Sequence, residues 1–233
     1  MKTKLFFIVI LMCFSLQAQK NKHTRWNEML GKYVDTLGNV DYKAWSKETA
    51  NLEAYIQTLK RLPPLESASK SAKLSYWINA YNALTVQLIL QNYPTESIRD
   101  LNEPWERKLF EVKNKSYSLG EIEHQILRKT DEPRIHFAIN CASASCPKLL
   151  NEAYQEKKLE FQLSQATRHF VNDTTKNKIS HDQLQLSRIF LWFGNDFGSK
   201  SERLQFIARY SKSKFKTPKI DYLPYNWSLN ESH

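Results

Sequence analysis

The spacing of apolar residues along the chain predicts a mostly helical protein. Apolar positions recur at helical intervals over residues 26–37, 44–62, 72–92, 159–171 and 201–210, and less extensively over 95–101 and from Ser187 onward. The helix over 72–92 is apolar on nearly every side, so we expect it at the centre of a domain. Its polar residues Asn79 and Asn82 either bond to neighbouring backbone or line a pocket.

Short strands complete the predicted fold. A hairpin is expected over 110–117, a further hairpin strand over 178–186, and an extended segment over 220–229 closes the chain. Ser118 and Glu121 have the spacing of a capping box, which opens a helix that continues to Arg128. These elements indicate an α+β fold, a mostly helical single domain around a small antiparallel sheet. We expect this domain to span residues 19–233, with its core over 74–230.

The segment from residue 133 to residue 147 is the most distinctive part of the sequence. Ile135, Phe137 and Ile139 alternate with smaller or more polar neighbours, which predicts a buried strand. That strand leads into a turn of small residues that contains Cys141 and Cys146. Backbone N–H groups at such a turn can point into a cleft, and a substrate can reach a thiol there. We therefore expect a site at this turn.

The first residues have the three parts of a secretory signal. Lys2 and Lys4 precede an apolar run from Leu5 to Leu16, and the small residue Ala18 follows. We expect cleavage after Ala18, so that residues 1–18 are a signal peptide and the protein is exported, periplasmic or secreted. The alternative is an uncleaved leader that anchors the chain in the membrane.

The net charge suggests an anionic surface as a neighbour. The formal charge of the full chain is +10, and loss of the two leader lysines lowers it. A basic exported protein can associate peripherally with an anionic membrane or envelope surface. The lysines are scattered and are not interleaved with aromatic residues, so nucleic acid is not an expected partner.

The two cysteines outside the leader allow two interpretations. Export to an oxidising compartment permits a Cys141–Cys146 disulfide, although so short a loop adds less stability than a long-range bridge. Alternatively, Cys141 is a thiol nucleophile, which needs a base and a group that orients the base. The candidate bases are His136 and His124, and the candidate orienting groups are Asp196, Glu123 and Asn140.

Other site chemistries are weaker. No histidine, cysteine or carboxylate pair has a standard zinc spacing, so neither a metal nor another cofactor is expected. Aromatic residues at 105, 190–193 and 227 either form a groove for a ligand or belong to the core.

Four segments together resemble the domain-of-unknown-function family 547 (DUF547). They are YWINAYNAL at 76–84, IEHQILR at 122–128, RIHFAINCASASCP at 134–147 and YNWSLN at 225–230. The family pattern has Asp where this chain has Asn226. Such domains occur in exported bacterial proteins and, in plants, beside a leucine-zipper segment inside the cell. The resemblance implies no particular activity, but intracellular members disfavour an obligatory disulfide, which favours thiols with a function or a cysteine pocket wall.

The leading hypothesis is an exported cysteine-dependent hydrolase or acyl transferase that acts on amide or ester bonds. Cys141 would be the nucleophile, with the histidine and carboxylate candidates above as base and orienting group. The expected substrate-binding residues are Asn79, Asn82, Arg128 and Asn140. The alternative is a non-catalytic binding or scaffold domain with a Cys141–Cys146 disulfide. Either way the ligand would be a small molecule, a peptide or a glycan, and the sequence leaves open whether the protein is an enzyme.

Overall fold

The helix α5 (Lys70–Gln91) is the centre of the helical part of the molecule, in the computed structural model that describes residues 22–232. Fifteen of its 22 residues are buried, on all sides, as its apolar sequence predicts. The side chain of Ser69 caps its first turn by accepting from the Ala72 N–H. The predicted signal peptide lies outside the described residues.

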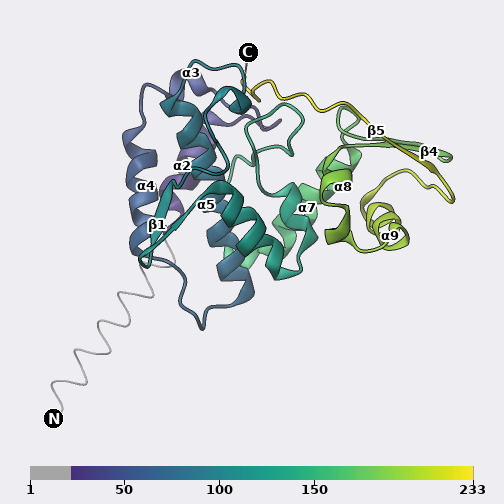
Figure 1. Ribbon diagram of the computed structural model, residues 1–233, viewed down its shortest axis with the longest axis horizontal. Coiled ribbons are helices and arrows are strands. Elements are labelled where there is room, and N and C mark those ends of the chain that lie inside the picture. The colour runs from purple at the N-terminus through teal and green to yellow at the C-terminus, as the bar shows by residue number, and fades with distance from the viewer. Residues whose placement is uncertain (1–21, 233) are drawn as a thin grey trace, which may run out of the picture.

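Most elements are short and follow one another closely, as Figure 1 shows. The other helices are α2 (Thr24–Tyr33), α3 (Tyr42–Trp45), α4 (Ala50–Arg61), η1 (Ile98–Asp100), α6 (Leu119–Glu121), η2 (Ile122–Leu127), η3 (Arg128–Thr130), η4 (Pro133–Phe137), η5 (Glu156–Lys158), α7 (Leu159–Asn172), α8 (Ile189–Trp192), η6 (Gly194–Phe197) and α9 (Lys200–Tyr210). The strands are β1 (Phe110–Val112), β2 (Lys115–Tyr117), β3 (Lys178–Ile179), β4 (Gln183–Leu186) and β5 (Lys219–Tyr222). The mostly helical α+β prediction is confirmed.

The N-terminal helices pack around aromatic rings. Trp26 lies between Tyr55, with which it is stacked at 5.5 Å between ring centroids, and Trp45 at 5.8 Å. The helix predicted over 44–62 is confirmed only from Ala50 onward, because α3 ends at Trp45 and α4 begins at Ala50. The Asp41 side chain starts α3 by accepting from the Ala44 N–H. The chain then turns before α4, so that both helices present aromatic residues to the same core.

The strand predicted over residues 135–139 is also wrong. The segment forms the 3₁₀-helix η4, which begins with Pro133 and is capped by the Glu132 side chain. Pro is suited to a first helical turn because its φ is already helical. Every residue from 135 to 140 is buried, so the alternation of the sequence does not separate a core face from a solvent face.

Two small sheets replace the one antiparallel sheet that the sequence predicted. β1 and β2 form the expected antiparallel hairpin. The second sheet has the order β3-β4-β5 and is mixed, because β4 pairs antiparallel with β3 and parallel with β5. It packs with α7, α8 and α9 around a second apolar core, which lies on the right of Figure 1.

The C-terminal segment, residues 223–232, runs from β5 back to the N-terminal helices (Figure 1). It makes isolated bridges from Ser228 to Ser97, from Leu229 to Ser143 and from Glu231 to Val40. These contacts join parts of the chain far apart in sequence, and they bring two aromatic residues of the segment to the turn at 140–147. Among residues 22–232, no helix is both long enough and apolar enough to cross a membrane.

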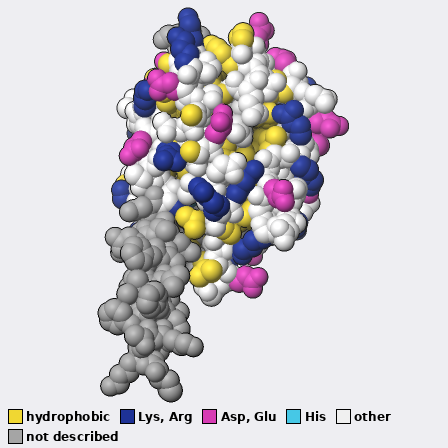
Figure 2. All heavy atoms as spheres, turned by 90° about the vertical axis from the view of Figure 1, so that its left-hand side faces the viewer, with side chains coloured by type: hydrophobic (Ala, Val, Ile, Leu, Met, Phe, Trp, Pro, Cys, Tyr) yellow, Lys and Arg dark blue, Asp and Glu magenta, His cyan; other side chains and the backbone are white. Residues whose placement is uncertain are grey.

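Charged side chains are mixed on the face that Figure 2 shows, the left-hand side of Figure 1. Lysine and arginine side chains alternate there with aspartate and glutamate, so this face has no large patch of one sign.

Candidate functional site

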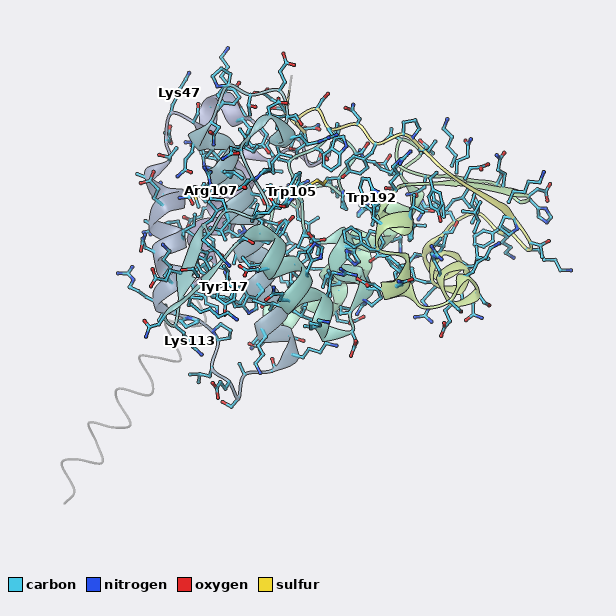
Figure 3. All side chains as sticks on the ribbon, in the orientation of Figure 1. Lys47, Trp105, Arg107, Lys113, Tyr117 and Trp192 are labelled. Atoms are coloured by element: carbon cyan, nitrogen blue, oxygen red, sulfur yellow. A yellow bond between two sulfur atoms is a disulfide. The ribbon has the colours of Figure 1, made fainter. Side chains whose placement is uncertain are left out.

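A cavity of about 320 Å³ lies between the helical part and the α8 region. Trp105 and Trp192 flank it from these two sides in Figure 3. Six aromatic residues line this aromatic cavity: Tyr81, Trp105, Trp192, Phe193, Tyr225 and Trp227. The other lining residues are Glu106, Glu123, His124, His136, Ile139, Cys141, Cys146, Pro147 and Ile189. The cavity thus contains both cysteines and both candidate histidines.

The turn at residues 140–147, which we call the cysteine turn, forms one wall. Cys141 and Cys146 are joined by a disulfide with an S–S distance of 2.17 Å. The Tyr225 hydroxyl donates to Cys146 Sγ at 3.2 Å and lies 3.4 Å from Cys141 Sγ. Ser143 Oγ is 3.2 Å from Cys141 Sγ. Within residues 22–232 neither sulfur has a histidine as hydrogen-bond partner, so the Cys–His pair of the leading hypothesis is not assembled in this bonded state.

The predicted substrate-binding amides hold the cysteine turn and its surroundings instead. Asn82 is 2% exposed; its Nδ2 donates to the Ala138 carbonyl at 2.9 Å and its Oδ1 accepts from the Asn140 N–H at 2.8 Å. Asn140 in turn donates to the Pro147 carbonyl at 2.7 Å. Neither Asn82 nor Asn140 lines the aromatic cavity.

Asn79, one turn earlier on α5, has the same kind of role elsewhere. Its amide makes two hydrogen bonds with the backbone of Tyr154, at 2.8 and 3.0 Å. Asn79 does not line the cavity either. Asn79 and Asn82 of α5 therefore both hold backbone in place, which is the first of the two interpretations that the sequence allowed.

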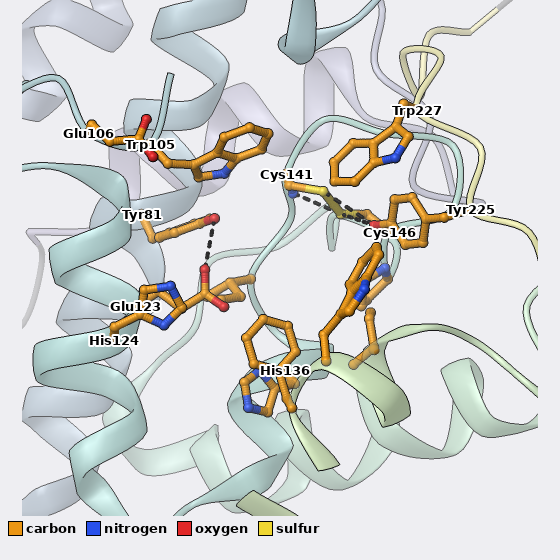
Figure 4. A pocket seen from close by; sticks show the side chains of 15 residues that line it. Tyr81, Trp105, Glu106, Glu123, His124, His136, Cys141, Cys146, Tyr225 and Trp227 are labelled. Atoms are coloured by element: carbon orange, nitrogen blue, oxygen red, sulfur yellow. Dashed lines mark hydrogen bonds between the residues drawn. A yellow bond between two sulfur atoms is a disulfide. The ribbon is translucent and has the colours of Figure 1, made fainter. Parts of the chain in front are cut away.

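Glu123 faces the disulfide across the cavity (Figure 4). It lies on η2, a π-helical stretch in which the Arg128 N–H donates to the Glu123 carbonyl five residues earlier. Glu123 is only 7% exposed, and burial raises the pKa of its carboxyl to about 7, while Arg128 and the Tyr81 hydroxyl act in the opposite direction. The Tyr81 hydroxyl lies 3.4 Å from Glu123 Oε2. Wide π-turns occur often at functional sites.

His136 forms the floor of the cavity in the view of Figure 4. Its Nε2 lies 2.8 Å from Asp196 Oδ2, and its ring stacks on Phe193 at 4.2 Å. Burial lowers the pKa of His136 to about 4, although Asp196 opposes this shift. The neutral ring therefore donates its Nε2–H to the carboxylate. Asp196 is thus the partner of a histidine, as the sequence suggested, but Nε2 is not free to act on a sulfur.

Arg128 holds Asp196 by two hydrogen bonds. Nε and Nη2 of Arg128 lie 2.6 and 2.7 Å from the two oxygens of Asp196, and this guanidinium keeps the pKa of Asp196 below its usual range. Nη1 of Arg128 donates to Nδ1 of the exposed His124 at 3.0 Å. Burial and the neighbouring Arg128 lower the pKa of His124. His124, Arg128, Asp196 and His136 thus form one connected chain of hydrogen bonds.

The sequence did not single out Tyr81 or Tyr225 as site residues. Tyr81 lies in an apolar helix, where the sequence pattern predicts that an aromatic residue belongs to the core. Tyr225 enters the site only because the C-terminal segment crosses the molecule. Trp105, Trp227 and Phe193, by contrast, belong to the aromatic residues that the sequence marked as a possible groove, and they line the cavity. In the described part of the chain, no group of His, Cys, Asp and Glu residues is arranged to hold a metal ion.

The fold and the site define an α+β domain with an aromatic cavity walled by a disulfide. Residues 65–171 match the family model described as "Protein of unknown function, DUF547", so this part of the chain, which includes α5, η2, the cysteine turn and α7, belongs to that family. Comparison with curated proteins and with solved structures gives no match.

Proposed function

We propose that the aromatic cavity binds a small organic cation, such as a compound with a quaternary ammonium group. The observation that carries this proposal is a buried carboxyl, Glu123, in a cavity whose other walls are largely aromatic. The face of an aromatic ring attracts a cation, by about 0.5–2 kcal/mol for each well-placed ring. A carboxylate adds the counter-charge that such a ligand requires.

The raised pKa of Glu123 and the lack of an ion-pair partner for it support the proposal of a cationic ligand. The nearest guanidinium, that of Arg128, is bound to Asp196 by two hydrogen bonds, so Glu123 has no ion-pair partner of its own among the described residues. A bound cation would stabilise the charged carboxylate and lower the pKa of Glu123 below about 7. Binding should therefore release a proton near neutral pH, and affinity should rise as the pH rises through 7.

The size of the cavity fits this class of ligand. A volume of about 320 Å³ is at the lower end of the range for small-molecule sites. The disulfide and the Tyr225 hydroxyl make one wall rigid. In this proposal the two cysteines shape the cavity, as in the binding-domain alternative that the sequence offered.

A pair of matched compounds tests the proposal. Choline and its neutral isostere 3,3-dimethylbutanol would be titrated into the protein and followed by tryptophan fluorescence and calorimetry. We expect choline to bind at least about tenfold more tightly than the isostere, with proton release at pH 7 in buffers of different ionisation enthalpy. Glu123→Gln should remove both the preference and the proton release. Equal binding of the two compounds, or no binding of either, contradicts the proposal.

A second candidate function is the cysteine-dependent hydrolase or acyl transferase. What favours it is that Cys141, His136, His124 and Glu123 line one cavity. It requires a thiol reductant to open the disulfide, which leaves two thiols, and a movement that brings a histidine to Cys141. Cys141 would then attack the carbonyl carbon of an ester or amide, release the alcohol or amine, and pass the acyl group to water or another acceptor.

Labelling with iodoacetamide and mass spectrometry separates the two functions. If the cysteines form a wall, both stay unlabelled until the protein is reduced. For the hydrolase, Cys141 would label rapidly after reduction, below the usual thiol pKa of about 8.5, and reduced protein would release p-nitrophenol from p-nitrophenyl acetate with an initial burst. Cys141→Ala should abolish that burst, whereas Cys146→Ala should preserve it.

We also propose that the protein acts in an oxidising compartment outside the cytosol, in contact with an anionic envelope surface. The disulfide supports this, because such bonds persist in oxidising compartments, and so do the leader-like sequence and a net charge that stays positive without the two leader lysines. Fractionation of cells with an antibody against the chain tests it. Recovery of the protein in the cytosolic fraction contradicts it.

A further inference from the structure

A second and larger groove lies on the other side of the cysteine turn. Its volume is about 730 Å³, and Cys146 and Pro147 line both this groove and the aromatic cavity. Five basic side chains line it: Lys148, Arg168, His169, Lys176 and Lys212. The cysteine turn therefore separates an aromatic cavity from a polar groove with many cationic groups.

The basic side chains of this groove are not paired directly with acidic ones, although the charge of Asp173 acts on Lys176. None of the five forms an ion pair within residues 22–232. Three carboxylates also line the groove, but each has another contact. Asp35 accepts from Asn39 and from the Leu37 N–H, Asp173 from Thr175, and Glu231 from Tyr93.

Lys148 and Lys212 each lie close enough to His169 to act on its charge. Apart from burial, the influences that lower the pKa of His169 are the positive charges of Lys148 and Lys212. The three residues come from different places in the chain: Lys148 follows the cysteine turn, His169 is on the last turn of α7, and Lys212 follows α9. The two lysine charges disfavour protonation of His169, and an anion bound beside them would offset this effect.

The backbone around two of these residues is fixed. Gly38 has a φ of 87°, and a Cβ at that position would lie 2.3 Å from Lys148 Cβ, so only glycine lets Lys148 sit where it does. The Lys212 N–H donates to Asn172 Oδ1 at 2.7 Å, and Asn172 itself bonds to the Tyr210 carbonyl at 2.8 Å. The fold therefore fixes the backbone of Lys148 and of Lys212 at the groove that His169 also lines.

We propose that Lys148, His169 and Lys212 bind the phosphate or sulfate group of a small anionic molecule in this groove. The two lysines can give such a group charge-assisted hydrogen bonds, and the bound anion would raise the pKa of His169 and so favour a further one from the protonated ring. The groove is larger than one inorganic anion requires, so the group would be carried by a small organic molecule such as a sugar phosphate. This site is independent of the organic cation proposed for the aromatic cavity.

Calorimetric titration of the full chain tests the site. The probes are inorganic phosphate and glucose 6-phosphate, with glucose as the neutral control. We expect glucose 6-phosphate to bind, glucose not to bind, and Lys148→Met or Lys212→Met to weaken binding about tenfold. Lys200→Met, an exposed lysine on α9 that does not line the groove, should leave binding unchanged. If phosphate binds as tightly as glucose 6-phosphate, the sugar contributes nothing and the site is one for the inorganic anion.

The pH dependence of anion binding tests the contribution of His169. Sulfate keeps its charge between pH 6 and pH 8, so its binding should tighten as His169 becomes protonated at the lower pH. His169→Gln should remove that dependence while leaving Lys148, Lys212, Arg168, Lys176 and the carboxylates Asp35, Asp173 and Glu231 in place. Thermal melts of each variant show that it is folded. The proposal is overturned if no anionic probe binds at millimolar concentration, or if Lys200→Met weakens binding as much as Lys148→Met does.

Discussion

The aromatic cavity and the basic groove share the cysteine turn as a wall, but they differ in chemistry. On one side of the turn a buried carboxyl group lies among aromatic rings; on the other, five basic side chains and three carboxylates line a polar space. Eight residues thus separate two different environments. The comparison shows that the turn has to be held rigidly, because a shift of its backbone would change both spaces together.

The two environments also treat their titratable groups differently. In the aromatic cavity burial is the largest influence, and it moves the pKa of Glu123 up to about 7 and that of His136 down to about 4, so both groups tend to be neutral. In the groove His169 is exposed, and neighbouring cations add to the lowering of its pKa. A cationic ligand in the aromatic cavity would therefore favour loss of a proton from Glu123, whereas an anionic ligand in the groove would favour protonation of His169.

Removing the hydrogen bonds by which Asn82 supports the cysteine turn should have the largest effect on the two sites. Asn82→Ala leaves the Ala138 carbonyl and the Asn140 N–H buried without partners, which should lower the free energy of unfolding by about 4 kcal/mol. We expect urea unfolding to show this loss, and the remaining folded protein to bind ligands poorly on both sides of the turn.

Asn79→Ala is the matched control, because it also removes two buried hydrogen bonds, but to Tyr154 rather than to the turn. It should destabilise the protein by a similar amount and leave both sets of ligand affinities unchanged. If Asn79→Ala weakens ligand binding as Asn82→Ala does, the cysteine turn is not the shared support.

Replacing the buried carboxyl should produce the next largest effect, and only at higher pH. The folded-state pKa of Glu123 is raised from 4.5 to about 7, so the stability contributed by its bound proton is complete below pH 4.5 and is lost as the pH rises through 7. Wild type should therefore lose about 3 kcal/mol relative to Glu123→Gln between pH 4.5 and pH 8.

The measurement is the difference in unfolding free energy between the two proteins at pH 5 and at pH 8. His136 titrates in the opposite sense, since its depressed pKa gives stability above 6.5 that is lost as the pH falls through about 4. Because His136 is present in both proteins, its contribution cancels in the difference. A difference that does not change with pH would mean that Glu123 ionises normally in the folded protein.

Local signals in the sequence predicted much of the fold correctly. The all-round apolar pattern placed α5 at the centre, and the Ser118–Glu121 capping box opened a helix where it was expected. His124 and Arg128, four residues apart on that predicted helix, are in contact. These features depend on residues near one another in the chain, so the sequence carries them directly.

The features that the sequence did not predict depend on the surroundings of a segment. The alternation at 135–139 predicted a strand, yet both sides of that segment are buried, and Pro133 with the Glu132 cap favours a 3₁₀-helix. The aromatic cavity is completed by Tyr225 and Trp227, which come from a segment that crosses the molecule. No local pattern indicates where such a segment returns, so the contact of Tyr225 and Trp227 with the cysteine turn could not be predicted from the sequence.

The smallest effect that we predict is on the exposed rim of the aromatic cavity. Trp192 lies on α8, is 43% exposed, and its ring centroid is 4.8 Å from that of Tyr225. Trp192→Ala should weaken choline binding by about 1 kcal/mol, which is roughly fivefold, and should change the unfolding free energy by about 1 kcal/mol or less.

Leu191→Ala is the control for Trp192→Ala, because Leu191 is the neighbour of Trp192 on α8, is 46% exposed and does not line the cavity. It should leave choline affinity unchanged, and neither variant should alter binding of glucose 6-phosphate, because the groove lies beyond the cysteine turn. Equal losses from both variants would show that α8 acts through its packing and not through the ring of Trp192.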